Sequence, residues 1–487
     1  MRKDQDLGRE VESLYRFLGD QLSQPAERQV PKVIAEMRKR IRDIDVEQKR
    51  LAAEIARRFP AYANFVNPQP PSIAQARAVL RDNEALINML STPSGTYIWA
   101  FRREGPLAFA RSPLAAAEVA RLVKILRAAL DPGEIASASA LPDFDLAAAH
   151  RLYVGLLLPV LAGWKGADNV FAVTGGAMAQ IPLSLLPTAP PRAATKNQLR
   201  YGDLATVPWL IRETAITQIP TVNALIALRR LPAASGQHKP FIGFGDPQFA
   251  QNAVAAVTAS PLRNASIPRA NREDGDEPQP PAWNDYASIP SLPDTRDEIL
   301  AIARSLRADV DADVFLGERA SRVNLLKQDL ARRRIIAFAT HGLLAGDYPG
   351  VSQPSLALAN PGDGRHGLLT LEDILSLKLD AEWVILSACN TAAGDGAGAE
   401  AISGLGRGFF YAGSRALLAT YWPVESVSAR LLVTGIFQRQ AENPGLSRAE
   451  ALRQSMLSVM NMTSADGRHS YGHPLFLAPY ALIGDGG

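Results

Sequence analysis

Two residues of this sequence have the types needed for a nucleophile and its acid–base partner. Cys389 is the only cysteine among the 487 residues, and His341 follows a long apolar run. A free thiol has a pKa near 8.5, so only a few per cent of it is thiolate at neutral pH. An imidazole beside it can take the thiol proton and later return it to a leaving amine. The pair predicts thiol catalysis, with Cys389 as nucleophile and His341 as acid/base.

Both residues come at the carboxyl ends of predicted strands. Arg334–Ala339 leads into Thr340-His341, and Trp383–Ser387 leads into Ala388-Cys389. In an open parallel sheet, functional groups gather beyond the carboxyl ends of the strands. If the two strands are neighbours, His341 and Cys389 therefore face one cleft. The backbone N–H groups of Gly342 and Cys389 are then the candidate donors for an oxyanion hole.

Taken alone, each residue favours a structural role. A lone cysteine is more often a small buried apolar residue, and a histidine at a strand end is more often only hydrogen-bonded. Their joint position at two strand ends shifts the balance towards catalysis. No other histidine stands at such a junction, and we interpret the rest as structural or exposed: His150, His238, His366, His469 and His473.

Strand and helix patterns alternate along most of the chain. Thr96–Phe101 and Leu107–Ala110 predict a hairpin, whereas Ser72–Leu90 predicts a helix that starts with a serine cap. The chain is predicted to close with a strand over Phe476–Ile483. This alternation predicts an α/β fold with a mostly parallel sheet and helices on both faces.

Two regions depart from this alternation. Residues 1–60 carry two apolar helical stripes, which predict either an arm that docks a partner or a local helical hairpin. Asn264–Tyr286 is a long acidic and proline-rich insertion, so we expect an exposed and mobile segment. A plain surface loop and a self-cleavage or activation site are both open interpretations of that insertion.

The composition limits the classes of partner. The chain has 52 Lys+Arg against 49 Asp+Glu, for a net charge of +3, which is too mild to indicate nucleic acid or an anionic membrane. One cysteine rules out an intramolecular disulfide and a cysteine-based zinc site. The start Met1-Arg2-Lys3-Asp4 does not resemble a secretory signal, and no uninterrupted apolar run reaches the ~18 residues of a membrane span. We expect a cytoplasmic protein without membrane contact.

The motif around the dyad resembles a known family. Phe338–Leu344, with Ala339-Thr340-His341-Gly342, and Leu386–Thr391, with Ser387-Ala388-Cys389-Asn390, are similar to motifs of the CHAT peptidases, relatives of caspases and separases often linked to tetratricopeptide repeats. The resemblance covers about Ala61 to Asp485 and includes several further short motifs: Gln180–Leu186, Gly245–Pro247, Leu292–Thr295 with Glu298, Leu316–Ala320, Glu400, Gly404-Leu405, Tyr421–Val424, His473-Pro474 and Gly484-Asp485.

The resemblance implies a caspase-like fold with three parts. A helical arm at 1–60 precedes a degenerate pseudo-caspase half at 61–235 and a catalytic half at 236–487. It also implies a His341–Cys389 dyad without a cofactor, a protein substrate, and a regulatory partner that docks on the N-terminal helices. The upstream repeats are absent or reduced to the arm, and Leu477 stands where the family usually has tryptophan.

The predicted substrate pocket lacks the acids that many relatives use to bind Arg or Lys. Those acids lie two residues before the cysteine or four after the motif tryptophan, where this chain has Ser387 and Ser426. A desolvated cation without a counter-charge costs several kcal/mol, so these positions predict a neutral pocket. Glu425, one residue away, is the group that could overturn this prediction.

Rival classes lack their signatures. Gly404–Gly408 superficially resembles a dinucleotide loop, but no strand precedes it, and glycines that let the helix Ala401–Tyr411 pack on the sheet explain it better. No serine-hydrolase elbow, zinc-peptidase motif or phosphate-binding loop is present in the sequence. The alternative from another class is a catalytically silent caspase-like scaffold for protein assembly, against which the intact dyad argues.

Overall fold

The structure, a computed structural model, describes most of the chain with several gaps. The described parts are residues 30–58, 70–131, 140–191, 199–232, 238–249, 289–343, 351–360, 367–388 and 404–487, together with Leu7, Glu10, Val11, Ser13, Leu14, Phe17 and Leu18. The predicted insertion Asn264–Tyr286 lies outside them, as do His366, Cys389 and Glu400.

The chain divides into two compact units, Met1–Ser72 and Ile73–Gly487. In the first, α2 (Pro31–Arg58) buries Ile44 completely, and Leu7 and Leu18 are also buried. The Arg40 guanidinium binds the Glu10 carboxylate through two hydrogen bonds of 2.6 and 2.9 Å. Helical residues near Glu10 therefore contact α2, as expected of a local helical hairpin; the predicted docking of a partner stays a prediction.

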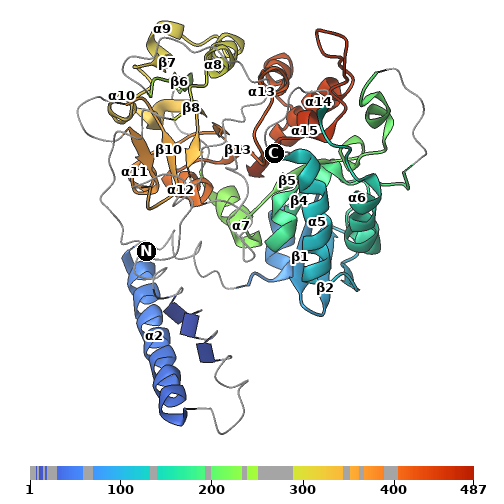
Figure 1. The fold of residues 1–487 in the computed structure, drawn as a ribbon, viewed down its shortest axis with the longest axis vertical. Helices are drawn as coiled ribbons and strands as arrows, with labels where there is room; N and C mark the ends of the chain where they lie inside the picture. Colours follow the sequence, from blue (N-terminus) through green and yellow to red (C-terminus); the bar gives the residue numbers. More distant parts are fainter. Residues whose placement is uncertain are drawn as a thin grey trace. The chain divides into compact units, whose positions relative to one another are not determined.

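An eleven-stranded sheet forms the centre of the second unit (Figure 1). Its order is β3-β2-β1-β4-β5-β14-β13-β12-β8-β6-β7. The strands are β1 Glu84–Thr92, β2 Gly95–Arg102, β3 Ala108–Ser112, β4 Asn169–Val173, β5 Ala215–Gln218, β6 Lys239–Pro247, β7 Val314–Gly317, β8 Arg333–Ala339, β12 Trp383–Ser387, β13 Ala416–Thr420 and β14 Tyr480–Gly484. Pairing is parallel except within β1–β2–β3 and between β13 and β14. This confirms the predicted mostly parallel α/β sheet.

Helices cover both faces of this sheet. The α-helices of the second unit are α4 Ile73–Ala78, α5 Ala116–Leu130, α6 Leu146–Leu152, α7 Val222–Arg230, α8 Asp294–Ser305, α9 Val310–Asp313, α10 Arg322–Leu326, α11 Leu371–Ser376, α12 Gly404–Ala412, α13 Ser426–Glu442, α14 Arg448–Met460 and α15 Pro474–Leu477, within the described residues. Phe409 of α12 packs on Phe338 of β8, and Phe437 of α13 packs on Trp383 of β12. Leu386 pairs with Phe338 and is three residues from Trp383. Since side chains alternate along a strand, α12 and α13 lie on opposite faces.

Two of the predicted elements were wrong. The helix predicted over Ser72–Leu90 ends at Ala78, and its second part is β1, where Ala85, Leu86 and Ile87 are all buried. A short apolar run cannot be assigned to helix or strand by periodicity alone, and burial on both sheet faces explains this one. The strand predicted from Phe476 begins only at Tyr480, because Pro474 starts the short helix α15.

Leu146–Gly163 is long and apolar enough to cross a membrane, judged by length and composition only. It comprises α6, a π-helical turn at Tyr153–Leu157 and a 3-10 segment at Leu158–Gly163. Leu152, Leu156 and Val160 are fully buried. We interpret the segment as a core helix.

A small second sheet lies directly after β8. It consists of β9 (Gly342–Leu343), β10 (Ser355–Ala357) and β11 (Leu368–Thr370), in the order β11-β10-β9. Leu343, Ala357 and Leu368 form a buried cluster with Phe249 and Ile289. The sequence did not predict these strands, because each has only two or three residues.

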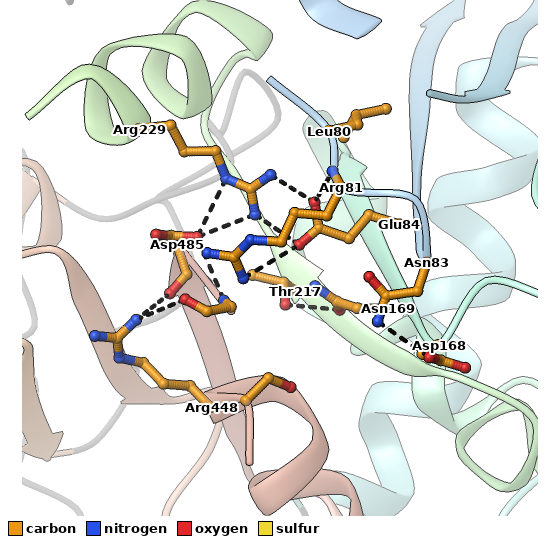
Figure 2. A network of polar contacts seen from close by, with 12 residues as sticks. Leu80, Arg81, Asn83, Glu84, Asp168, Asn169, Thr217, Arg229, Arg448 and Asp485 are labelled. Carbon is orange, nitrogen blue, oxygen red and sulfur yellow. Dashed lines mark hydrogen bonds and ion pairs between the residues drawn. The ribbon is translucent and has the colours of Figure 1, made fainter. Parts of the chain in front are cut away.

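An ion-pair network ties the end of the last strand to the first half of the sheet (Figure 2). Arg229 of α7 donates to both carboxylate oxygens of Glu84, at 2.5 and 2.6 Å, and to Asp485 at 3.2 Å. Its side chain is 9% exposed, and that of Glu84 is 3% exposed. Arg448 donates to the backbone carbonyl of Asp485 at 3.3 Å. The network thus links side chains on both sides of the place where β14 pairs with β5.

Candidate active site

The two strands that carry the predicted dyad are hydrogen-bonded neighbours. β8 and β12 run parallel, with Ala339 opposite Ser387 and Phe338 opposite Leu386. Thr340-His341 and Ala388 therefore leave the sheet at the same carboxyl edge. Cys389 itself is outside the described residues, so the structure shows the histidine and the strand that leads to the cysteine.

The His341 ring is buried and held by contacts from distant parts of the chain. Its Nε2 atom lies 2.8 Å from the carbonyl oxygen of Pro290. The Phe249 ring packs beside it, with 5.8 Å between ring centroids. The backbone carbonyl of His341 accepts a hydrogen bond from Ala357 N at 3.0 Å. These contacts fix both the backbone and the ring of His341.

The contact with Pro290 also selects the tautomer of His341. A carbonyl oxygen can only accept, so Nε2 carries the proton in this hydrogen bond. Nδ1 is then the nitrogen that can accept a proton from a reacting group. Pro290 and Phe249 could not be identified from the sequence, because a backbone carbonyl and an apolar ring leave no signal in residue type.

The residues next to the histidine are anchored in the same way. The Thr340 hydroxyl donates to the Ala357 carbonyl. Gly342, a predicted oxyanion donor, opens β9 and stands opposite Leu356 of β10. Its backbone therefore lies at the edge immediately after His341, and its role as a donor stays a prediction.

Ser387 lies within the core at the end of β12. Its side chain is buried, and its hydroxyl is 2.9 Å from the Tyr480 hydroxyl of β14. One residue on, the Ala388 carbonyl accepts from the Thr420 hydroxyl of β13. These side-chain contacts hold the strand end that precedes Cys389.

The other two predicted pocket residues have separate partners. The Glu425 carboxylate caps α13: it accepts from Val427 N at 3.1 Å and Ser428 N at 2.7 Å, and the residue is 6% exposed. The Ser426 hydroxyl instead donates to the Asp294 carboxylate at 2.8 Å. The structure thus brings an acid from α8 beside Ser426, which sequence spacing could not reveal.

His473 and Gly408 lie in surroundings that indicate structural roles. The His473 ring is fully buried, lies 3.0 Å from the Pro142 carbonyl, and accepts from Leu475 N. Desolvation lowers its pKa to about 4, so it stays neutral. A Cβ on Gly408 would lie 2.7 Å from the Leu371 side chain of α11, so this glycine lets α12 pack closely on α11. The predicted close packing is therefore against a helix and not against the sheet. Within the described ranges, no three His, Cys, Asp or Glu side chains are grouped to hold a metal ion.

The fold and this edge define an α/β protein with a fixed histidine beside the strand that leads to its one cysteine. The model of the CHAT domain family matches residues 146–485. The chain therefore belongs to the CHAT domain family. This match includes both strands of the candidate site and confirms the predicted family.

Individual relatives are more distant. Mouse tetratricopeptide repeat protein 28 is 29% identical over 120 residues, which are 25% of this chain and 4% of that protein. The chain thus corresponds to a small part of that relative.

Among solved structures, a complex of Saccharomyces cerevisiae separase with securin matches with a TM-score of 0.45 and 11% identity, over 84% of this chain and 30% of that chain. The Arg-specific cysteine proteinase gingipain R matches with a TM-score of 0.31 and 9% identity, over 70% of this chain and 66% of that chain. At these scores the assignment rests on the family model.

Proposed function

We propose that this chain is a cysteine endopeptidase that hydrolyses protein substrates through His341 and Cys389. The observation that carries the proposal is the hydrogen bond from His341 Nε2 to the Pro290 carbonyl, at 2.8 Å. It leaves Nδ1 as the proton acceptor, and His341 follows β8, the strand next to the one that leads to Cys389.

The reaction follows from these groups. His341 Nδ1 takes the Cys389 proton, and the thiolate attacks the scissile carbonyl carbon to form a tetrahedral intermediate. The N–H groups of Gly342 and Cys389 are our proposed donors to its oxyanion. The imidazolium then protonates the leaving amine as the C–N bond breaks. A water molecule, deprotonated by His341, hydrolyses the thioester and restores the thiol.

The Pro290 contact contributes in each step in which the ring is charged. A carbonyl oxygen facing Nε2–H stabilises the imidazolium and keeps the imidazole ring in one orientation. Because the Ala357 contact fixes the backbone, the ring does not have to reorganise between the two proton transfers.

Cleavage profiling of whole proteomes tests the proposal. We expect new protein termini with the wild type and none with Cys389→Ala, and His341→Ala should lower the rate by about 10²–10⁴-fold. Thermal unfolding of both variants serves as the fold control. Equal cleavage by wild type and Cys389→Ala would refute the mechanism and leave the silent scaffold as the better account.

We further propose that the N-terminal helices receive a regulatory protein and that the purified enzyme has little activity without it. The candidate surface is the apolar stripe Met37–Ile55 of α2 (Pro31–Arg58), in which Ile44 is completely buried and Met37 and Ile41 are half-buried. Deleting residues 1–60 should uncouple activity from the partner while the dyad remains. High activity of the purified full chain would contradict this proposal.

A further inference from the structure

The segment from Pro290 to Asp294 crosses the edge of the sheet where His341 lies. At one end, the Pro290 carbonyl accepts from His341, which follows β8. At the other end, the Asp294 carboxylate accepts from Ser426, which follows β13. β12 lies between β8 and β13, and all three strands are parallel. The segment therefore passes over the carboxyl end of β12, the strand that leads to Cys389.

Asp294 is held in place from the core side. The next residue, Thr295, is fully buried; its hydroxyl donates to the Leu292 carbonyl and accepts from Asp246 N, both at 2.7 Å. Asp294 itself is exposed and begins α8. Its carboxylate is thus fixed in position but reachable from solvent.

The charge of Asp294 is not neutralised by a described neighbour. In the described part of the chain, Asp294 has no ion pair, and its hydrogen-bond partner Ser426 is neutral. Arg296, two residues along α8, is paired with Asp246 at 2.7 Å. The carboxylate therefore lies without a described counter-charge at the edge where β8, β12 and β13 end.

We infer that Asp294 determines specificity by binding a Lys or Arg side chain just before the scissile bond. The inference rests on the proposed peptidase function and replaces the neutral pocket that Ser387 and Ser426 predict. Ser426 orients the carboxylate through its 2.8 Å hydrogen bond. Glu425 does not compete for this role, because its two oxygens cap α13.

The chemistry favours such a cation. An exposed carboxylate already oriented by one hydroxyl can accept a charge-assisted hydrogen bond from a guanidinium or ammonium group. Bonds of this kind contribute enough to change a rate ratio by about 10- to 100-fold. An apolar side chain at the same place would gain nothing from the charge.

The test uses the full chain and peptide acyloxymethyl ketones that differ only in the residue before the reactive carbonyl, Arg or Leu. The readout is the rate of covalent labelling of Cys389. We expect wild type to prefer Arg over Leu, and Asp294→Asn to lower this preference about 10- to 100-fold. The matched control is Asp297→Asn, which removes the same charge from an exposed acid in the same turn of α8. It should leave the preference unchanged.

A rescue variant makes the test specific for the charge. Asp294→Asn combined with Ser426→Asp places a carboxylate on the neighbouring position and should restore most of the preference for Arg. Equal preferences in wild type, Asp294→Asn and Asp297→Asn would show that Asp294 only serves the first turn of α8, and would overturn the inference. Labelling by Leu but not Arg also overturns it, while the peptidase proposal stands. If neither ketone labels Cys389, the result contradicts the proposed peptidase function.

Discussion

At the scale of single residues, the position of a side chain was predictable and its partners were not. His341 could be placed at a strand end because a buried apolar run precedes it. Pro290 is 51 residues away from His341 in sequence, and Phe249 still further. Only the folded chain brings these groups together, and a carbonyl that orients a ring has no sequence signature.

His473 gives a pH-dependent prediction at this scale. Its pKa is lowered to about 4 by burial, whereas an unfolded histidine titrates near 6.5. Between these pH values the unfolded chain binds one more proton at His473 than the folded chain does. The free energy of unfolding therefore has its full value above about pH 6.5 and declines as the pH falls towards 4. The loss should reach on the order of 3 kcal/mol.

Urea unfolding of wild type and His473→Asn at pH 7 and pH 5 checks this. The asparagine variant is less stable at pH 7, since it loses the contact with the Pro142 carbonyl. Its stability should depend less on pH over that interval. An identical pH dependence in both proteins would contradict the assignment of this titration to His473.

At the scale of elements, apolar patterns predicted most strands of residues 236–487 because each is a continuous buried run. The pattern failed where burial and length were ambiguous, as in β1, and where strands were very short, as in β9 to β11. The pattern also did not predict the cap formed by Glu425. Sequence spacing suggested a pocket residue, whereas α13 begins there and needs a cap for its first N–H groups.

The cap gives the element-scale prediction. Glu425→Ala should destabilise the protein by about 1 kcal/mol, because Val427 N and Ser428 N lose their acceptor. The preference for the residue before the scissile bond should not change. A denaturation midpoint and a peptide library measure the two effects separately. Loss of cleavage after Arg in a fully stable Glu425→Ala would mean that this carboxylate lines the pocket after all.

At the scale of the whole molecule, the sequence predicted one mostly parallel sheet but not how its halves join. β14, from the end of the chain, enters between β5 and β13 and is antiparallel to β13. Alternating elements imply parallel neighbours, so this insertion could not be read from the pattern. The Arg229 network of Figure 2 closes the same junction.

The network predicts a large, coupled effect on stability. Glu84→Ala leaves the buried Arg229 guanidinium without its closest counter-charge and should cost about 3–5 kcal/mol. Glu84→Ala combined with Arg229→Met should recover part of this loss, since no buried guanidinium then lacks its Glu84 counter-charge. Thermal unfolding of both single variants and the double variant measures the coupling. Strictly additive losses would show that the two side chains do not act as a pair.

The most direct test of the dyad is covalent labelling of Cys389 by an electrophilic peptide in a lysate of cells that express the full chain. Since the chain has one cysteine, intact mass reports labelling without ambiguity. We predict that wild type is labelled, that Cys389→Ala is not, and that His341→Ala reacts about 10²-fold more slowly because the thiol loses its base. Equal labelling rates in wild type and folded His341→Ala would contradict the dyad.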